Sequence, residues 1–581
     1  MALLLLGLAA LLLPALGRMP FERAEIYFAD GARAMVERGD WLVPYYRGEP
    51  FFDKPALTYW LIAAAFEVFG FSPGVARLVP AAAALVVLLV TLLLGVQLVG
   101  RRASFAGGLV LATTLAFVGF GRVAMSDMLL ALFTNAALAL GVAAWRPAAA
   151  RWAVPALGAA LGLGFLTKGP VAVLLPGLGL LLLAWQRRRQ PWPFTPGRVA
   201  AAAVLFVLFG CTWWLAVWAR LGTWPLAYFF LRENLERFAG STYDSGREPW
   251  FYLTTYLVQG APWSLFLPLA VWGALRRRPC GHAPPASLAG VRLLLGWLAL
   301  MAVPLSLSRG KIDYYLLPFY PAAALVVGHL FSEGHWGRLE RLWARAALVV
   351  LGVALAFGAR LPAQVPDAWL PPSAQIVALA VGAGVAIVAL AVVAVRLTPR
   401  RILVALAGVA AALFLALVGV LLPPFRAAQP NDAILADVAR EQRYEPGLRV
   451  AYCNDPVRVQ RDVLFELRLA ADERCDLWAA VAAKAPYLLV LDESEWSLGH
   501  AAGMRHVGTY AYLPASVLTA RSLFRGVEPG RLALFANFES TDPVALLEAK
   551  RQWRRYVQTL ERAQAGADAP RPRRKWRRHR P

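Results

Sequence analysis

The sequence predicts an α-helical polytopic membrane protein that ends in a small α/β domain. Of its 581 residues, 59% are hydrophobic and only 16% are charged, and the mean hydropathy is +0.53. A soluble globular chain is about 45–50% apolar and about 25% charged, so both proportions point to a membrane. Apolar runs of about 20 residues, the length that crosses a bilayer, recur along the chain.

Thirteen membrane spans are expected from these runs. The first is Met1–Gly17, a retained signal anchor, because it has no basic segment before it and no small-residue cleavage site. A long amphipathic stretch follows at about residues 18–75. The other twelve spans are expected at about 76–99, 104–121, 128–145, 152–166, 170–185, 199–219, 256–275, 288–306, 316–331, 345–361, 374–395 and 402–422.

Clusters of arginine predict the orientation of these spans. Each cluster lies between an even-numbered span and the next one; the clusters are Arg101–Arg102, Arg146 with Arg151, Arg187–Arg189 with Arg198, Arg276–Arg278, Arg338 with Arg341 and Arg345, and Arg396 with Arg400–Arg401. Cytoplasmic loops carry an excess of Lys and Arg, so these connections and the N-terminus should be cytoplasmic. The 18–75 stretch and everything after the thirteenth span should lie outside.

The net charge of +23 therefore comes from the arginine clusters that predict the orientation of the spans and from one basic tail. It does not indicate nucleic-acid binding.

The C-terminal part of the chain has a different character. Residues 1–425 form the expected membrane domain, 426–545 a small outer α/β domain, and 546–581 a basic, disordered tail. The domain has strand-like runs at Leu448–Tyr452 and Tyr487–Leu491 and a helical pattern at Asp432–Glu441. Cys453 and Cys475 either form a disulfide there or remain two thiols. The tail either binds anionic lipid headgroups or is a solubilising end.

Candidate functional residues lie at span ends on the predicted outer face, where an ionisable group is a functional candidate by default. The first set follows the first span and comprises Glu22, Glu25 and Asp30. Helical spacing puts Glu22 and Glu25 on one face. The alternative is a solvated helix face.

Three further residues each have a functional and a structural interpretation. Lys54, between aromatics and a proline, suits a phosphate, although Asp53 could simply neutralise it. Asp127, flanked by apolar residues, needs a partner or a function, and Arg122 could be that partner. Lys168 ends a span at a Gly-Pro turn and could be an interfacial side chain only.

The remaining candidates come from two outer segments. Residues 232–238 contain Glu233 and Arg237, and residues 306–318 contain Lys311, Tyr314 and Tyr315. Histidine is absent from all these clusters, so they lack the residue that a Ser-His or a His-metal mechanism requires. A divalent metal near the carboxylates is possible. The inventory suits a lipid-linked phosphate together with a carboxylate base at the outer leaflet.

The order of these motifs resembles that of the bacterial aminoarabinose transferases. More broadly, it resembles the GT-C glycosyltransferases of the protein O-mannosyltransferase clan. The motifs are the acidic loop helix, Gly-Asp-Trp-Leu-Val-Pro (39–44), Phe-Asp-Lys-Pro (52–55), Asp127, Leu-Thr-Lys-Gly (166–169), Glu-Asn-Leu-Glu-Arg-Phe (233–238) and Ser-Arg-Gly-Lys-Ile-Asp-Tyr-Tyr-Leu-Leu-Pro (308–318).

This resemblance implies a GT-C fold in a bacterial inner membrane. It implies transfer of a sugar, usually with inversion, from a polyprenyl-phosphate carrier to an acceptor at the periplasmic face. The acceptor would be lipid A, another envelope glycolipid or a protein. The resemblance further implies that Lys54 and Arg237 hold the carrier phosphate, helped by Tyr314 or Tyr315.

One departure concerns the catalytic carboxylate that the resemblance implies. Members of the family usually have Asp-Glu in the first loop, where this chain has Ala24-Glu25. Glu25 occupies the second acidic position, Glu22 lies one turn away, and Asp127 matches a later acidic position. We therefore expect Glu25, with Asp127 or Glu22, to orient or deprotonate the acceptor, while Lys54, Arg237 and Lys311 offset charge on the leaving phosphate.

Two other classes of function remain as alternatives. A transporter or flippase of lipid-linked sugars would place ionisable residues in mid-span, whereas here they sit at span ends. A non-catalytic scaffold in envelope assembly would fit the replaced aspartate.

Overall fold

The computed structural model describes the chain in segments. These are residues 1–18, 21, 23–46, 49–239, 247–276, 285–332, 336–358, 384, 398–421, 431–444, 449–452, 487–492, 505–512 and 530–536. They belong to two units, Met1–Ala428 and Gln429–Pro581. The predictions about Glu22, Cys453, Cys475, the 374–395 span and the 546–581 tail concern residues outside the described ones.

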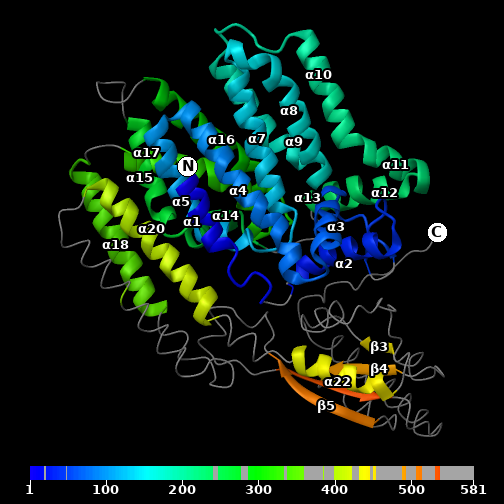
Figure 1. Ribbon diagram of the computed structural model, residues 1–581. Coiled ribbons are helices and arrows are strands. Elements are labelled where there is room, and N and C mark those ends of the chain that lie inside the picture. The colour runs from blue at the N-terminus through cyan, green and yellow to red at the C-terminus, as the bar shows by residue number, and fades with distance from the viewer. Residues whose placement is uncertain are drawn as a thin grey trace, which may run out of the picture. The chain divides into compact units, whose positions relative to one another are not determined.

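The first unit is built from helices (Figure 1). Its first half contains α1 (Ala2–Leu12), α2 (Arg23–Arg38), strands β1 (Tyr45–Tyr46) and β2 (Glu49–Pro50), α3 (Leu57–Phe69), α4 (Pro73–Leu98), α5 (Arg101–Ala112), α6 (Leu115–Phe120), α7 (Asp127–Ala144), α8 (Pro147–Lys168) and α9 (Val171–Gln186).

The same unit continues through a second set of helices. These are α10 (Pro196–Phe206), η1 (Val207–Cys211), α11 (Thr212–Leu221), α12 (Trp224–Ala227), η2 (Tyr228–Glu236), α13 (Arg237–Ala239), α14 (Phe251–Gln259), η3 (Trp263–Phe266), α15 (Leu267–Arg276), α16 (Pro285–Leu307), η4 (Asp313–Phe319), α17 (Tyr320–Ser332), α18 (Arg338–Gly358), α20 (Pro399–Ala416) and η6 (Leu417–Leu421).

The described helices fit a membrane protein that crosses the bilayer several times. Seven of them are long and apolar enough to span it. The pair Phe251–Gln259 and Trp263–Arg276 passes the same test together but is bent by 114°, so the run predicted as one straight span at 256–275 is broken. The predicted span at 104–121 is also divided, into α5 and α6. The count of thirteen spans stays a prediction.

The amphipathic 18–75 stretch folds into two helices joined by a short hairpin. α2 carries the acidic residues, and β1 pairs with β2 in antiparallel register, with Tyr45 opposite Pro50. The loop between α2 and β1 is fastened to α11: Arg220 donates to Asp40 at 2.9 Å, and the Trp213 indole donates to the Leu42 carbonyl at 2.9 Å. These contacts fix the hairpin and the segment that follows it.

The core of the unit lies where long apolar helices pack against each other. Leu88, Leu111, Leu138, Leu294 and Leu325, from α4, α5, α7, α16 and α17, are all buried there. Some crossings need glycine: a Cβ on Gly158 of α8 would overlap the Ala202 carbonyl of α10. In lipid the hydrophobic effect does not hold helices together, so transmembrane helices associate through close packing. Small residues allow that packing because they let the two backbones approach each other.

The second unit contains a four-stranded mixed sheet and one described helix. The strand order is β3 (Arg449–Tyr452), β4 (Tyr487–Asp492), β6 (Gly530–Ala536), β5 (Arg505–Tyr512). β3 and β4 are parallel, and the other pairs are antiparallel. The helix α22 (Asn431–Tyr444) contacts β5 through a hydrogen bond from Tyr510 to Asp437.

Candidate functional site

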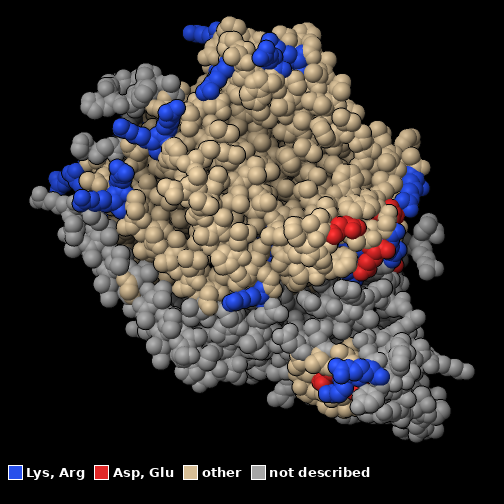
Figure 2. Space-filling model, in the orientation of Figure 1, with Lys and Arg blue, Asp and Glu red and all other residues tan. Residues whose placement is uncertain are grey.

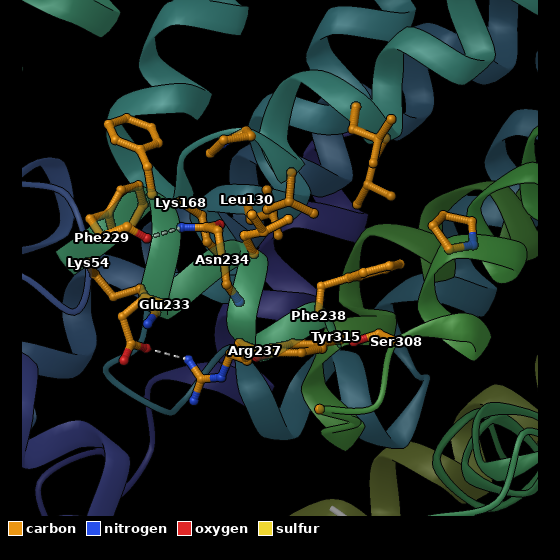
Figure 3. A pocket seen from close by; sticks show the side chains of 18 of the residues that line it. Lys54, Leu130, Lys168, Phe229, Glu233, Asn234, Arg237, Phe238, Ser308 and Tyr315 are labelled. Carbon is orange, nitrogen blue, oxygen red and sulfur yellow. Dashed lines mark hydrogen bonds and ion pairs between the residues drawn. The ribbon is translucent and has the colours of Figure 1, made fainter. Parts of the chain in front are cut away.

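A cavity of about 590 Å³ in the first unit gathers five of the eleven predicted site residues (Figure 3). Its polar lining comprises Asp53, Lys54, Lys168, Glu233, Asn234, Arg237 and Ser308, with Tyr315 beside them. Apolar side chains form the remaining wall: Leu130, Pro170, Val171, Leu174, Leu175, Phe229, Phe230, Leu235, Phe238, Pro304 and Leu305. The lining of the cavity is thus apolar on one side and charged on the other.

Segments far apart in the sequence bring the polar groups together. Asp53 and Lys54 precede α3, Lys168 is the last residue of α8, and Tyr315 lies in η4. Glu233 belongs to η2, a nine-residue π-helix. Such wide helical turns occur often at functional sites, because they redirect side chains that a regular helix would place elsewhere.

The segment that carries Lys54 is held in place by the aromatic residue beside it. Phe52 is 1% exposed, and its ring lies 6.2 Å from that of Trp213 and 5.3 Å from that of Trp224, between ring centres. Burial of a Phe side chain stabilises by about 1.5–3 kcal/mol. This anchor fixes the position of the neighbouring Asp53 and Lys54.

Two ion pairs stand together at the charged end of the cavity. The Lys54 ammonium lies 3.2 Å from a carboxylate oxygen of Asp53, and the Arg237 guanidinium lies 2.9 Å from one of Glu233. Figure 3 shows the Glu233–Arg237 pair with Lys54 close by. The two carboxyl groups, Asp53 and Glu233, are close enough to influence each other's ionisation.

The environment shifts the pKa of the two carboxyl groups in opposite directions. Burial, and then the nearby charge of Asp53, raises the pKa of Glu233 to about 7. Burial is the largest single influence on Asp53 and acts in the same direction, but the nearby charges of Lys54 and Arg237 and the hydrogen bonds to Asp53 together outweigh it, so the pKa of Asp53 lies below its usual range. At neutral pH, Asp53 is therefore ionised and Glu233 is about half protonated.

A third ion pair borders the cavity. Lys168 donates to the Asp127 carboxylate, and both side chains are buried. The Lys168 ammonium also lies 4.5 Å from the centre of the Tyr315 ring and 5.6 Å from that of Tyr314. Asp127 thus has Lys168 as its partner. Arg122, the partner considered from sequence, instead donates to the carbonyls at the end of α1.

Glu25 is buried in a different set of contacts. Its two carboxylate oxygens accept from Arg77 at 2.8 and 2.7 Å, and one of them also accepts from the backbone N–H of Ala124 at 2.7 Å. Arg77 donates further to the Leu16 carbonyl. Glu25 therefore ties α2 to α4 and to the segment before α7, and it does not line the cavity described above.

The other predicted residues fall around the site. Asp30 pairs with Arg33 of its own helix at 2.9 Å. Lys311 is buried, and its carbonyl accepts from Arg247 at 3.0 Å. Tyr314 packs edge-on against Phe120 and Tyr315. None of these three residues lines the cavity.

Three polar lining residues, Asp53, Asn234 and Ser308, were not singled out as site residues from sequence. Asp53 was considered only as the neutralising partner of Lys54, and Asn234 only as part of its motif. Asn234 donates to the Phe229 carbonyl at 2.8 Å (Figure 3), which braces the π-helix. Within the described residues, no three His, Cys, Asp or Glu side chains form a group that could hold a metal.

The comparisons with known proteins agree with the motif resemblance. A model of the dolichyl-phosphate-mannose-protein mannosyltransferase family matches residues 53–214. An undecaprenyl phosphate-alpha-4-amino-4-deoxy-L-arabinose arabinosyl transferase from Pseudomonas paraeruginosa is 36% identical over 318 residues, which is 53% of this chain and 55% of the relative. A protein of the same name from Pectobacterium carotovorum is 33% identical over 330 residues, 55% of this chain and 57% of that one.

The similarity in structure extends further along the chain. The crystal structure of ArnT from Cupriavidus metallidurans bound to undecaprenyl phosphate covers 93% of this chain and 98% of its own, with a TM-score of 0.73 and 22% sequence identity. In sequence, the chain spans about half the length of the curated relatives it matches. The predicted resemblance to the GT-C aminoarabinose transferases is confirmed, and the fold is theirs.

Proposed function

We propose that this protein is a membrane glycosyltransferase that moves a sugar from a polyprenyl-phosphate carrier to lipid A or another envelope acceptor at the periplasmic face. The observation that carries this proposal is the cavity, which joins an apolar wall to a cluster of three cations. An isoprenoid chain fits the wall, and its phosphate fits Lys54, Arg237 and Lys168. Its sequence relatives are named as undecaprenyl-phosphate aminoarabinose transferases.

The cations stabilise the leaving group of the proposed reaction. When the bond between the sugar and the carrier oxygen breaks, negative charge develops on the carrier phosphate. Fixed cations at that position stabilise the transition state more than the ground state, which accelerates the reaction. Their own carboxylate partners hold them in place before the carrier arrives.

The carboxylates favour an acceptor that is already anionic. Each of the four carboxylates forms an ion pair with a cation; they are Asp53, Glu233, Asp127 and Glu25. A carboxylate held in an ion pair is a poor general base for an acceptor hydroxyl. A phosphate nucleophile, such as that of lipid A, needs orientation but no general base. We therefore assign Glu25 to positioning, and Asp127 to holding Lys168 at the cavity.

The membrane topology belongs to the same proposal, with thirteen spans, a cytoplasmic N-terminus and a periplasmic C-terminal domain. Support comes from α8, which begins beside Arg146 and ends at Lys168. Its 22 residues extend about 33 Å at about 1.5 Å per residue, close to the hydrocarbon thickness of about 30 Å. The cavity therefore lies at the end of α8 opposite the arginine cluster, which supports a periplasmic position for it.

The test is transfer of labelled aminoarabinose from its undecaprenyl-phosphate carrier to lipid A by the purified protein in vesicles. Loss of a cation aimed at the leaving group should cost about 10²–10³-fold in rate, so Lys54→Ala and Arg237→Ala should each lower transfer by about that factor. Arg188→Ala is the matched control, because this exposed arginine donates only to the Trp185 carbonyl at the other membrane face.

Each rival function gives a different result in that assay. A flippase would move the carrier lipid across the bilayer without any transfer, and a scaffold would do neither. Full transfer activity in both Lys54→Ala and Arg237→Ala would contradict the assignment of the phosphate site.

A further inference from the structure

The charged end of the cavity already balances its own charges before any ligand enters. Lys54 pairs with Asp53, and Arg237 pairs with Glu233, and all four line the same cavity. The third cation, Lys168, is paired with Asp127. An incoming phosphate therefore finds no surplus of positive charge among these described residues when every carboxyl group is ionised.

The two carboxyl groups are close enough to influence each other's ionisation. Asp53 and Glu233 each hold a cation at the same end of the cavity, and the charge of Asp53 disfavours a second negative charge on Glu233. The Glu233 side chain is 1% exposed, against 23% for Asp53. Glu233 is the better place for the proton, since water stabilises its ionised form less.

Other groups face Glu233 from the elements packed around it. Lys54 and Asp53 approach from the segment before α3, and Arg237 and Tyr228 from its own helical segment. Tyr315 approaches from η4, and Lys168, the last residue of α8, is paired with Asp127 at the start of α7. Within this described set, every carboxyl group has a cationic partner, but Glu233 has the least exposed side chain and the charge of Asp53 beside it, so its protonation costs least.

We propose that phosphate binding in this cavity is coupled to the uptake of one proton, and that Glu233 receives it. Protonated Glu233 releases Arg237 from its ion pair, which gives the site one unit of positive charge for a singly charged phosphodiester. The proposal deepens the function above and rests on it only for the nature of the ligand, a polyprenyl phosphate.

The direction of the pH dependence follows from linkage. The pKa of Glu233 is about 7 without ligand, and a bound anion raises it further. Below pH 7 the proton is already present, so affinity is constant. Above pH 7 binding must draw a proton from solution, and affinity falls by up to about tenfold per pH unit.

The experiment measures the dissociation constant of a short isoprenyl methyl phosphodiester for the full-length protein in detergent, between pH 6 and pH 9. This probe carries one negative charge throughout, so its own titration does not contribute. Wild-type protein should lose about tenfold in affinity per unit above pH 7. Calorimetry in two buffers of different ionisation enthalpy should show uptake of about one proton at pH 8.

The variant Glu233→Gln keeps the size and hydrogen-bonding capacity of the side chain and removes its charge. It should bind the probe with an affinity that does not change with pH, and above pH 8 it should bind more tightly than wild type, a gain that misfolding does not produce. Glu236→Gln, on the same helical segment but outside the cavity lining, is the matched control and should keep the wild-type slope.

Two results would overturn the proposal while leaving the proposed function intact. One is a wild-type affinity that does not change from pH 6 to pH 9, and the other is an undiminished slope in Glu233→Gln. If the wild-type protein does not bind the phosphodiester at any pH, the phosphate site itself, and with it the proposed function, is contradicted.

Discussion

At the scale of single residues, the pair of Glu25 and Arg77 shows how a motif residue can serve the structure. Both side chains are almost fully buried, and they form a two-point ion pair. Removing one partner of a buried pair leaves an uncompensated charge, which costs about 3–5 kcal/mol. We expect Glu25→Ala and Arg77→Ala each to lower stability by about that amount, and the double variant to lose less than the sum.

Thermal unfolding in detergent measures the predicted loss of stability. An assay of transfer activity then distinguishes a structural role of Glu25 from a catalytic one. If Glu25 positions α2, the loss of transfer should follow the loss of folded protein. If Glu25→Gln kept its melting temperature but transferred sugar about 10²–10⁴-fold more slowly, Glu25 would be the catalytic carboxylate after all.

Residue types and neighbours in sequence were enough to predict part of the site. Lys54, Lys168, Glu233, Arg237 and Tyr315 stood out as polar groups at apolar span ends, and all of them line the cavity. The partners of Asp127 and Glu25 did not follow from the sequence, because Lys168 and Arg77 lie 41 and 52 positions away from them. Only the packed helices bring such groups into contact.

At the scale of elements, uniformly apolar runs were the easiest to predict. α4, α7 and α16 fall close to the expected spans, since about 20 apolar residues have few alternatives to a membrane helix. The bend between α14 and α15 was missed because its residues, Gly260, Ala261 and Pro262, are too apolar to interrupt a hydropathy pattern. Helix breaks inside protein depend on neighbours that satisfy the backbone, which composition does not report.

The contact between α8 and α10 gives a prediction at this scale. A methyl group on Gly158 would meet the Ala202 carbonyl, whereas one on Gly177 of α9 would meet nothing within 4 Å. Overpacking costs about 1–3 kcal/mol, while Gly to Ala in an open helix position gains about 0.5–1 kcal/mol. Gly158→Ala should therefore lower the melting temperature in detergent, and Gly177→Ala should leave it unchanged or raise it. Equal effects of the two substitutions would show that α8 and α10 are not in close contact.

At the scale of the whole molecule, basic and acidic residues are unevenly distributed along the first unit. The chain has no Asp or Glu between Asp127 and Glu233, so the arginines at the loop ends of α7 to α10 stand without nearby carboxylates in sequence. In Figure 2 these basic side chains lie at one end of the first unit, and the acidic side chains visible on that unit lie around α2 and α3. One end holds the chain's orientation signal, and the other holds the balanced charges of the site.

This distribution predicts which residues are accessible from each side of the membrane. With thirteen spans, Arg188 is cytoplasmic and Arg443 of α22 is periplasmic. Single cysteines at these positions, in a parent whose four native cysteines are replaced and which still transfers sugar, report the side directly. In spheroplasts, an impermeant maleimide should label Arg443→Cys at once, and should label Arg188→Cys only after detergent opens the membrane. Labelling of both positions in intact spheroplasts would mean an even number of spans between the arginine loop and α22, and the cytoplasmic assignment of Arg188 would then be wrong.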